Sequence, residues 1–479
     1  MDNNKISLLV DFYELTMSNG YLVNGHKDKE VYFDYFFRKV PDKGGFAITA
    51  GLEQFIDYVK NFNLADEDLK MLKDMGQFDD KFIEYLKNFE FTGDIYAIKE
   101  GTPVFPNTPI ITVKAPIIQA QLIETVLLNT LNFQSLIATK ANRIKRSANN
   151  KKVVDFGARR AHSYDASLYG ARASYIGGFD GTSNLLAHKE FNIPVVGTMA
   201  HSWVQFYDDD KLAFDAYKKA YPKNSTFLID TFDVLNSGLP KAIEVFKTME
   251  KDSKKGIRLD SGNISYLSKK VRNELDKHGL EDVNIVASNS LDEYKIDEIE
   301  DDPDSAIDFY GVGERMITSK SEPVFGGVYK LVAIKEDEEI MPKIKLSEDA
   351  EKITNPGLKE IYRLYDNETN KAFSDLLTIK GEKIGKTYKL FDELMPWKSK
   401  VVKNFEAKKL QEKIIEDGKV VYEFPTLKEI REYRKKEINK LWDSLLKLNN
   451  PDRYFVNLSF DLWGEKRKLL EKYSNKNEH

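Results

Sequence analysis

The sequence of 479 residues contains no cysteine. This absence excludes disulfide bonds, thiolate nucleophiles and cysteine-based zinc or iron–sulfur sites. No stretch reaches the roughly 18 consecutive apolar residues that a membrane helix needs, so we expect no interaction with a membrane interior. Charge of one sign is also missing, because 72 Lys and Arg stand against 77 Asp and Glu. A net charge of −5 does not favour binding to nucleic acid or to an anionic membrane surface, so small molecules are the expected partners.

The amino terminus lacks the basic segment of a secretion signal and has only a short apolar run at residues 6–10. Together with the missing cysteines, this pattern predicts a soluble cytoplasmic protein. A single hydrophobic core rarely supports a chain of this length, so we expect two or three domains.

The first third of the chain mixes helix and strand patterns. Residues 31–40 are aromatic-rich and predict a strand, and residues 51–62 have apolar residues at helical spacing. Residues 91–116 have β-branched runs cut by Pro and Gly, which predicts an antiparallel sheet with tight turns. Residues 117–144 predict one long helix or two. We therefore expect an N-terminal mixed α+β domain over residues 1–140, joined by part of 320–345.

From about residue 150 the pattern becomes repetitive, with short apolar runs followed by Gly or polar residues and a helical stretch. The runs are residues 153–156, 173–176, 194–196, 226–229, 256–259, 283–287 and 307–310. Their starts lie roughly 20 to 32 residues apart, which is typical of successive strand–helix units of a parallel sheet or barrel. The fold class predicted is α/β, with a closed or nearly closed irregular barrel as catalytic domain over residues 141–330. The dinucleotide-binding pattern GxGxxG is absent.

Residues 331–479 form the predicted C-terminal region, a Lys/Glu-rich extension after about residue 345. Residues 427–448 predict a charged amphipathic helix with Thr426 as its N-cap and with Trp442 and Leu445 facing inward. Residues 381–387 imitate a phosphate-binding P-loop, but three residues separate the glycines where four are needed. Because strand-like runs flank this segment, we interpret it as a hairpin.

Polar residues follow the predicted strands of the barrel. They are Asp155, Arg159, Arg160, Gly177, Gly178, Thr198, His201, Ser202, Asp230, Asp233, Asp260, Ser261, Ser288, Asn289, Ser290, Gly311 and Gly313. Strand ends of a barrel meet at one rim, where catalytic groups lie. Arg offers forked donors to phosphate or carboxylate, and Gly/Ser turns expose backbone N–H groups. The rim therefore predicts an anionic sugar-phosphate substrate, although each residue taken singly also fits a surface ion pair or a tight turn.

Histidine is scarce, with six in the chain. His201 follows the run Pro-Val-Val-Gly-Thr-Met-Ala, at a predicted strand end where a reacting side chain projects. The competing interpretation is a structural histidine.

Seven segments along the chain resemble nicotinate phosphoribosyltransferases, in the same order and over roughly residues 5–335. They are LVDFYELTM at 9–17, FFR at 36–38, DFGARR at 155–160, GTSN at 181–184, GTMAHS at 197–202, RLDSG at 258–262 and GGVYKL at 326–331. An ordered set of segments is far more specific than any one motif.

The resemblance implies a type II phosphoribosyltransferase fold, an irregular α/β barrel with a separate mixed domain, in a homodimer whose sites draw on both subunits. It implies joining of nicotinate to phosphoribosyl pyrophosphate (PRPP) in NAD salvage, with ATP hydrolysis. His201 then matches a histidine that is phosphorylated by ATP. Tyr13, Thr198 and Arg258 match nicotinate-binding positions, and Thr318 matches a PRPP-binding position.

The other substrate-binding candidates, from their places on the rim, are Arg159, Ser261, Asn289, Gly311 and Gly313. The departing pyrophosphate gains charge, so Mg²⁺ is the expected cofactor; no metal ligands are identified. Asp230 and Asp260 are the expected catalytic acids beside His201 or the ribose hydroxyls. A carboxylate on one imidazole nitrogen would fix the tautomer and leave the other nitrogen free to attack phosphorus. Their alternative role is a structural network at the rim.

Three other functions compete. A nicotinamide enzyme would want an acidic group where Tyr13 lies, and quinolinate enzymes are much shorter. A sugar-phosphate isomerase or aldolase barrel would place a reactive Lys or Glu at a strand end, and the predicted strand ends carry none. A non-catalytic binding protein would leave His201 and Asp230 without a purpose.

Overall fold

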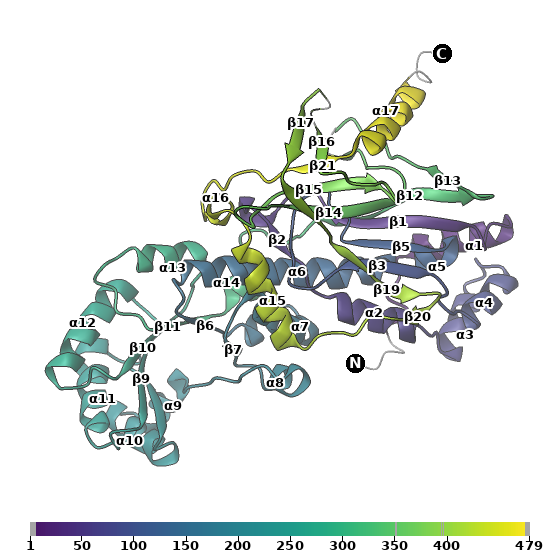
Figure 1. Ribbon diagram of the computed structural model, residues 1–479. Coiled ribbons are helices and arrows are strands. Elements are labelled where there is room, and N and C mark those ends of the chain that lie inside the picture. Colours follow the sequence, from purple (N-terminus) through teal and green to yellow (C-terminus); the bar gives the residue numbers. More distant parts are fainter. Residues whose placement is uncertain (1–5, 350–351, 394, 396, 475–479) are drawn as a thin grey trace. The chain divides into compact units, whose positions relative to one another are not determined.

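The computed structural model describes residues 6–349, 352–393, 395 and 397–474 (Figure 1). By their contacts the residues form two compact units, Met1–Leu136 with Val324–His479, and Ile137–Pro323. The predicted regions 1–140 and 331–479 fall mostly in the first unit, and 141–330 mostly in the second. The borders at 140 and 330 stay a prediction, because grouping by contacts does not show which parts fold independently.

The first unit is built on a seven-stranded antiparallel sheet in the order β13-β12-β1-β5-β3-β19-β20. The strands are β1 (Glu30–Phe37), β3 (Asp94–Ile98), β5 (Ile111–Pro116), β12 (Gly327–Glu336), β13 (Glu339–Pro342), β19 (Gln411–Glu416) and β20 (Lys419–Val420). β1 lies in the middle, and its aromatic side chains are buried. The strand predicted at 31–40 and the antiparallel sheet predicted at 91–116 are thus confirmed. A small second sheet pairs β2 (Ala47–Ile48) with β4 (Pro103–Val104).

Six helices lie along the same part of the chain. They are α1 (Phe12–Val23), α2 (Leu52–Asn61), α3 (Asp66–Asp74), α4 (Asp80–Lys87), α5 (Ile117–Leu122) and α6 (Glu124–Ser147). The apolar faces of α2 to α5 and the first turns of α6 share one core with the sheet. The helix predicted at 51–62 is confirmed, and residues 117–144 form two helices. Among the described residues, no helix combines the length and apolarity needed to cross a membrane.

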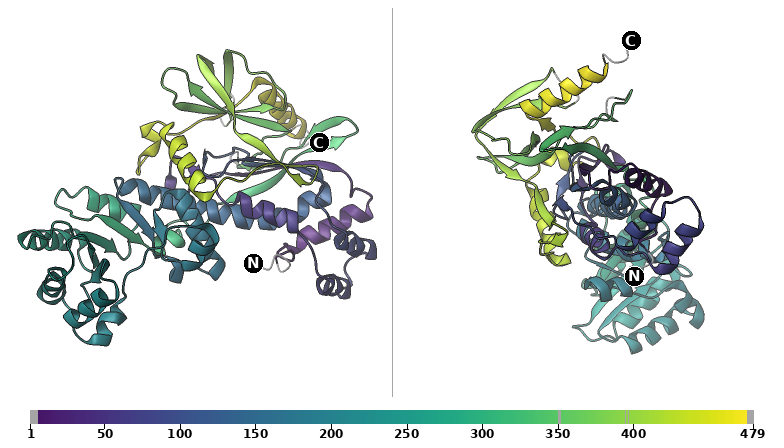
Figure 2. Two further views of the ribbon diagram at one scale, coloured as in Figure 1. Left: turned by 60° about the horizontal axis from the view of Figure 1, so that its bottom comes forward. Right: turned by 90° about the vertical axis from the view of Figure 1, so that its right-hand side faces the viewer.

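The rest of the first unit is a six-stranded sheet in the order β17-β16-β21-β15-β14-β18. Its strands are β14 (Lys359–Asp366), β15 (Ala372–Ile379), β16 (Thr387–Asp392), β17 (Ser399–Lys403), β18 (Phe405–Lys409) and β21 (Val456–Leu458). Helix α17 (Phe460–Ser474) packs against β15 and β16 and is the helix nearest to the label C in both views of Figure 2. Helices α15 (Leu427–Asn439) and α16 (Asp443–Leu446) precede β21.

Two predictions for this sheet region need correction. Residues 381–387 do connect two strands, but these do not form a hairpin, because β21 pairs with both β15 and β16 and lies between them. Thr426 caps α15 as predicted, with its side chain accepting from the N–H of Glu429. Helix α15 ends at Asn439, and Trp442 is 42% exposed instead of facing inward, whereas Leu445 is buried.

The second unit contains a six-stranded parallel sheet in the order β7-β6-β11-β10-β9-β8. Its strands are β6 (Lys152–Asp155), β7 (Gly181–Thr182), β8 (Asn224–Leu228), β9 (Lys254–Leu259), β10 (Asn284–Ser288) and β11 (Phe309–Val312). Since β11 returns to pair with β6, the strands follow the circular order of a barrel that is open between β7 and β8. The predicted irregular α/β barrel is confirmed in this curled, half-open form.

Helices follow each of these strands along the chain (Figure 1). They are α7 (Tyr164–Gly177), α8 (Leu185–Phe191), α9 (His201–Tyr207), α10 (Asp210–Ala220), α11 (Leu239–Phe246), α12 (Ile264–Lys277), α13 (Glu293–Glu300) and α14 (Glu314–Ile317), with short helical turns η3 (Ala158–Arg160) and η4 (Val234–Gly238).

Two of the seven predicted barrel strands are wrong. Residues 173–176 belong to helix α7, which Ser163 caps and which ends at Gly178 with a φ of 118°. A β-carbon on Gly177 would lie 2.5 Å from the carbonyl oxygen of Ala138, so this apolar run is a closely packed helix. Residues 194–196 contribute only one bridging residue, Val195, opposite Thr182. Short apolar runs do not distinguish a buried strand from a buried helix.

Candidate active site

The carboxyl ends of β8, β9 and β10 bring three of the predicted rim segments into direct contact. Asp230 follows β8, and its Oδ2 accepts hydrogen bonds from the N–H of Asp260 at 3.1 Å and from Ser261 Oγ at 2.6 Å. Asp260 follows β9, and its Oδ1 accepts from the hydroxyl of Ser288 at the end of β10. Asp230 thereby orients the turn that carries Asp260 and Ser261. Its second oxygen, Oδ1, is buried with no hydrogen-bond partner among the described residues.

His201 opens helix α9 and lies beside this acidic network. Its Nδ1 is 3.1 Å from Thr231 Oγ1, and its Nε2 is 3.7 Å from Asp260 Oδ2. The side chain of His201 is 40% exposed, so one side of the ring is open to solvent. We expected a carboxylate to hold one imidazole nitrogen, but the hydrogen-bonding partner is the Thr231 hydroxyl. Thr231 was missed by the sequence analysis, although it directly follows Asp230.

Arg258 lies within β9 and connects the site to the segment before α9. One terminal nitrogen donates to Thr198 Oγ1 at 2.5 Å and to the carbonyl of Met199 at 3.0 Å. The Nε atom is buried and has no partner in the part of the chain that the structure describes. Burial and the nearby charge of Arg159 lower the pKa of Arg258, although the charges of Asp260 and Asp230 act in the opposite direction. The guanidinium thus keeps an unused donor in a partly desolvated position, where a carboxylate would bind well.

Asp155, at the end of β6, has a structural role at the rim. It is fully buried and accepts from the N–H of Gly157 at 2.7 Å and from Thr182 Oγ1 at 2.8 Å. Burial raises its pKa to about 6, although both hydrogen bonds act in the opposite direction. The two contacts tie β6 to β7 and set the turn that leads to Arg159, which is exposed.

Four predicted substrate-binding residues make no hydrogen bond with Asp230 or Asp260 in the part of the chain that the structure describes. Asn289 follows β10 with a φ of 79°, a strained conformation that is common at functional sites. A β-carbon on Gly311 would lie 2.4 Å from the Phe156 ring, and one on Gly313 would lie 3.0 Å from the Phe156 carbonyl oxygen. These two glycines therefore permit close packing at the rim. Thr318 directly follows α14 as its C-cap, is half-buried, and donates to the carbonyl of Glu314 at 2.8 Å.

Tyr13 belongs to the first unit, whereas the other predicted site residues belong to the second. It lies in the first turn of α1 and is 45% exposed. Burial of part of its side chain, together with the charges of Glu124 and Glu14, raises the pKa of its hydroxyl. The ring is therefore accessible to a ligand, and its hydroxyl lies near these carboxyl groups.

The described residues contain no group of three or more His, Asp or Glu side chains that could enclose a metal ion. Mg²⁺ commonly binds through one or two carboxylates together with substrate phosphates, and does not need a full protein cage. The unpartnered Oδ1 of Asp230, beside Asp260, fits that mode of binding.

Three family models together match most of the chain. The nicotinate phosphoribosyltransferase N-terminal domain matches residues 8–132, the nicotinate phosphoribosyltransferase family matches residues 151–342, and the C-terminal domain of that enzyme matches residues 358–466. The family match thus extends beyond residue 335, into the region where the sequence resemblance had ended.

Individual proteins agree with the family models. The chain is 42% identical to nicotinate phosphoribosyltransferase of Bacillus subtilis over 99% of its own length and 97% of that protein. It is 34% identical to the enzyme of that name from Dictyostelium discoideum, covering 95% and 87% of the two chains. The crystal structure of human nicotinic acid phosphoribosyltransferase superposes with a TM-score of 0.84 at 27% identity, covering 97% of this chain and 100% of that one. The chain therefore belongs to the nicotinate phosphoribosyltransferase family.

Proposed function

We propose that this enzyme joins nicotinate to PRPP, releasing pyrophosphate and forming nicotinate mononucleotide for NAD salvage, with hydrolysis of ATP. The observation that carries the proposal is the unused donor of Arg258, which lies on the same strand edge as Asp230, Asp260 and His201. An anionic aromatic acid and a sugar phosphate need this combination of a forked cation and a polar rim.

In the proposed reaction the ring nitrogen of nicotinate uses its lone pair to form a bond with the anomeric carbon of the ribose. The bond from that carbon to the pyrophosphate oxygen breaks, and the electron pair leaves with pyrophosphate. No base is required, so the enzyme acts mainly by orientation and by stabilising charge. Arg258, held by Thr198, binds the nicotinate carboxylate, and Tyr13 stacks on its ring. Arg159, Ser261, Asn289, Gly311, Gly313 and Thr318 bind the sugar phosphate.

The proposed ATP step uses His201 as the phosphoryl acceptor. Thr231 occupies Nδ1, which leaves Nε2 to attack the γ-phosphorus of ATP while ADP departs. Water then hydrolyses the phosphohistidine to inorganic phosphate. Asp260, 3.7 Å from Nε2, is placed to stabilise the imidazolium form of the ring. Asp230 acts by orienting Asp260.

The proposal further includes Mg²⁺ as the cofactor, ATP as a substrate and a homodimer as the assembly. Mg²⁺ would be held by Asp230 and Asp260 together with substrate phosphates, and it would neutralise the charge of the departing pyrophosphate.

The test is to incubate the purified protein with nicotinate, PRPP and Mg²⁺, with and without ATP, and to follow nicotinate mononucleotide, pyrophosphate and ADP. We expect product without ATP, more product with it, and ADP release coupled to turnover. Parallel incubations with nicotinamide or quinolinate in place of nicotinate should give little product. A preference for either of these substrates would overturn the assignment.

A further inference from the structure

Helix α1, which carries Tyr13, is fastened at its first turn by a second helix. Asp11 occupies the N-cap position, but its side chain does not cap the helix. Instead the backbone N–H of Asp11 donates to Thr125 Oγ1 at 3.1 Å. Thr125 lies in the first turn of α6, which is 114 residues further along the chain. The start of α1 is therefore set by a long-range contact.

The same threonine makes a second contact with α1. Thr125 Oγ1 donates to Glu14 Oε1 at 2.5 Å, so one hydroxyl accepts from Asp11 and donates to Glu14. Glu14 is fully buried. Its other oxygen, Oε2, and the nearby buried hydroxyl of Ser18, one turn along α1, have no hydrogen-bond partners among the described residues. The Thr125 hydroxyl is thus the side-chain contact that holds this carboxyl group.

Burying a carboxyl group that has a single hydrogen-bond partner lowers the free energy of unfolding. An apolar side chain at the same place would lower it less. Burial, aided by Glu124 and Asp11, raises the pKa of Glu14 to about 8, so the group is mainly protonated near neutral pH. Buried polar groups that lower the stability of the folded protein are concentrated at functional sites.

Tyr13 lies between the two fastened positions, since Asp11 and Glu14 flank it in the sequence. The hydroxyl of Tyr13 lies near Glu124, which directly precedes Thr125. Thr125 itself holds both sides of the backbone turn that carries Tyr13.

We propose that Glu14 and Thr125 are positioning residues that hold the Tyr13 ring in its nicotinate-binding orientation. The inference rests on the proposed function, in which Tyr13 stacks on nicotinate. Loss of the Thr125 hydroxyl frees the start of α1, so the ring spends less time in the binding orientation. The apparent affinity for nicotinate falls by that fraction, and binding of PRPP is unaffected.

The experiment compares Thr125→Val, which removes the hydroxyl, with Thr125→Ser, which keeps it. We expect Thr125→Val to raise the nicotinate KM about tenfold, with less than about a twofold change in the PRPP KM, because a lost buried hydrogen bond is of that size. Thr125→Ser should stay near the wild-type value. Glu14→Gln keeps an acceptor for Thr125 and should also stay near it. Glu14→Ala loses only the Glu14 contact and keeps the Asp11 contact, so it should raise the nicotinate KM by less than Thr125→Val does. The double variant Glu14→Ala/Thr125→Val should be no worse than Thr125→Val, because Thr125→Val already breaks both contacts.

Thr16→Ala is the matched control, since its exposed hydroxyl donates only to the Tyr13 carbonyl within the same helix, at 3.1 Å. Calorimetric titration with nicotinate gives a readout independent of turnover. Equal losses for both substrates, or a poor Thr125→Ser, would overturn the positioning role. A Tyr13→Ala variant separates the positioning role of Glu14 and Thr125 from the stacking role of Tyr13. If it raises the nicotinate KM while Thr125→Val does not, the positioning role is wrong; if Tyr13→Ala itself leaves nicotinate binding unchanged, the stacking role of Tyr13 is wrong.

Discussion

At the scale of single residues, side chains of the candidate site form hydrogen bonds with residues from neighbouring segments of the chain. Arg258 is held by Thr198, Asp260 by Ser288, and Ser261 by Asp230. These three side chains are therefore held in place by the protein, which reduces the entropy lost on binding.

We predict that Arg258→Ala weakens nicotinate binding much more than PRPP binding. A charge-assisted carboxylate contact is worth about 1.5–3 kcal/mol, which corresponds to roughly a tenfold to hundredfold rise in the nicotinate KM. Steady-state kinetics with each substrate varied in turn measures the split. Lys254→Ala, an exposed cation at the other end of β9, is the control and should change neither KM. Equal effects of Arg258→Ala on both substrates would count against the carboxylate contact.

For His201 we predict that γ-labelled ATP leaves an acid-labile, base-stable label on the protein. His201→Ala should abolish the label and the stimulation by ATP, while some ATP-independent synthesis remains. His188→Ala is the control and should keep the label, because the Nδ1 of His188, in α8, lies 2.8 Å from the carbonyl oxygen of Ile193 and is engaged there. A label that survives in His201→Ala would refute the assignment.

At the scale of secondary-structure elements, the packing of helices against sheets leaves little room at some positions. Gly327 begins β12, and a β-carbon there would lie 2.1 Å from Asn132 Oδ1 of α6 and 2.7 Å from the Tyr35 ring of β1. Tyr35 and Asn132 are themselves hydrogen-bonded at 2.9 Å. The glycine thus allows α6, β1 and β12 to meet.

We predict that Gly327→Ala destabilises the protein by about 1–3 kcal/mol, the usual cost of overpacking a core. Thermal or denaturant unfolding measures the change. Gly464→Ala in α17, where a β-carbon would meet nothing within 4 Å, should be neutral or slightly stabilising. Equal effects of the two substitutions would mean that Tyr35 and Asn132 can move to make room for the added methyl group.

The contact between α1 and α6 predicts a pH dependence of stability. The pKa of Glu14 is raised from 4.5 to about 8 in the folded protein, so between these values the folded state binds more protons than the unfolded state. The contribution of Glu14 is therefore present below about pH 4.5 and is lost as the pH rises towards about 8.

Glu14→Gln cannot ionise, so its stability relative to the wild type should increase between about pH 5 and pH 8. Unfolding midpoints measured across this range report the difference. Glu84→Gln, at an exposed position on α4, is the control and should differ from the wild type by a constant amount. A constant difference for Glu14→Gln as well would show that the Glu14 carboxyl titrates normally.

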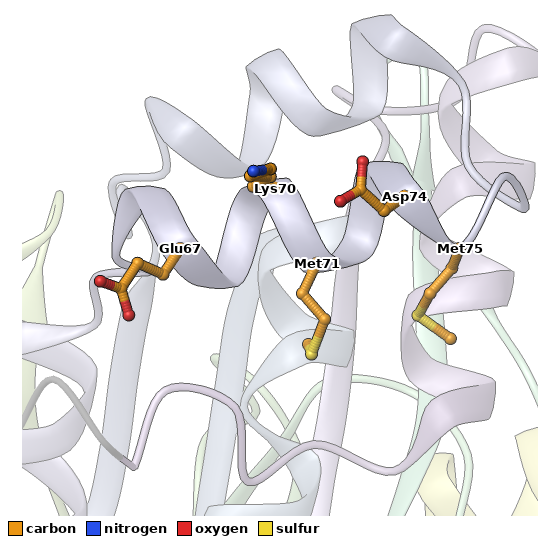
Figure 3. A pocket seen from close by; sticks show the side chains of 5 residues that line it. All are labelled: Glu67, Lys70, Met71, Asp74 and Met75. Atoms are coloured by element: carbon orange, nitrogen blue, oxygen red, sulfur yellow. The ribbon is translucent and has the colours of Figure 1, made fainter.

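At the scale of the whole molecule, apolar side chains are exposed on helices of the first unit. Leu9, Phe12 and Met17 are exposed at or near the start of α1. Met71 and Met75 line a pocket on the outside of α3, and they project from the same side of that helix (Figure 3). The lining of this pocket, completed by Glu67, Lys70 and Asp74, offers no catalytic group, whereas exposed apolar surface of this kind is typical of protein interfaces.

We predict a homodimer in solution, as the family resemblance implies. Light scattering should give a mass near twice 55.1 kDa at micromolar concentration. A mass of one chain across the accessible concentration range would contradict the prediction.

The positions of Asp230 and Asp260 at strand ends were predicted from the sequence alone, because polar residues follow apolar runs there. Seven ordered segments, one of which contains His201, carried the resemblance to the family. Local patterns suffice there, because a parallel strand places its last residues at the sheet edge whatever its neighbours are. Capping of α15 by Thr426 was predicted for the same reason, since the capping contacts span three residues.

Contacts between distant elements and side chains could not be predicted from the sequence and were found in the folded structure. Residues 173–176 form a helix because small residues allow α7 to approach α6, and β21 enters between β15 and β16 from about 80 residues further along the chain. Thr231 holds His201, and Thr125 holds Glu14, across sequence separations of 30 and 111 residues. Such contacts depend on the packing of whole elements, and the periodicity of a short segment carries no information about its distant neighbours.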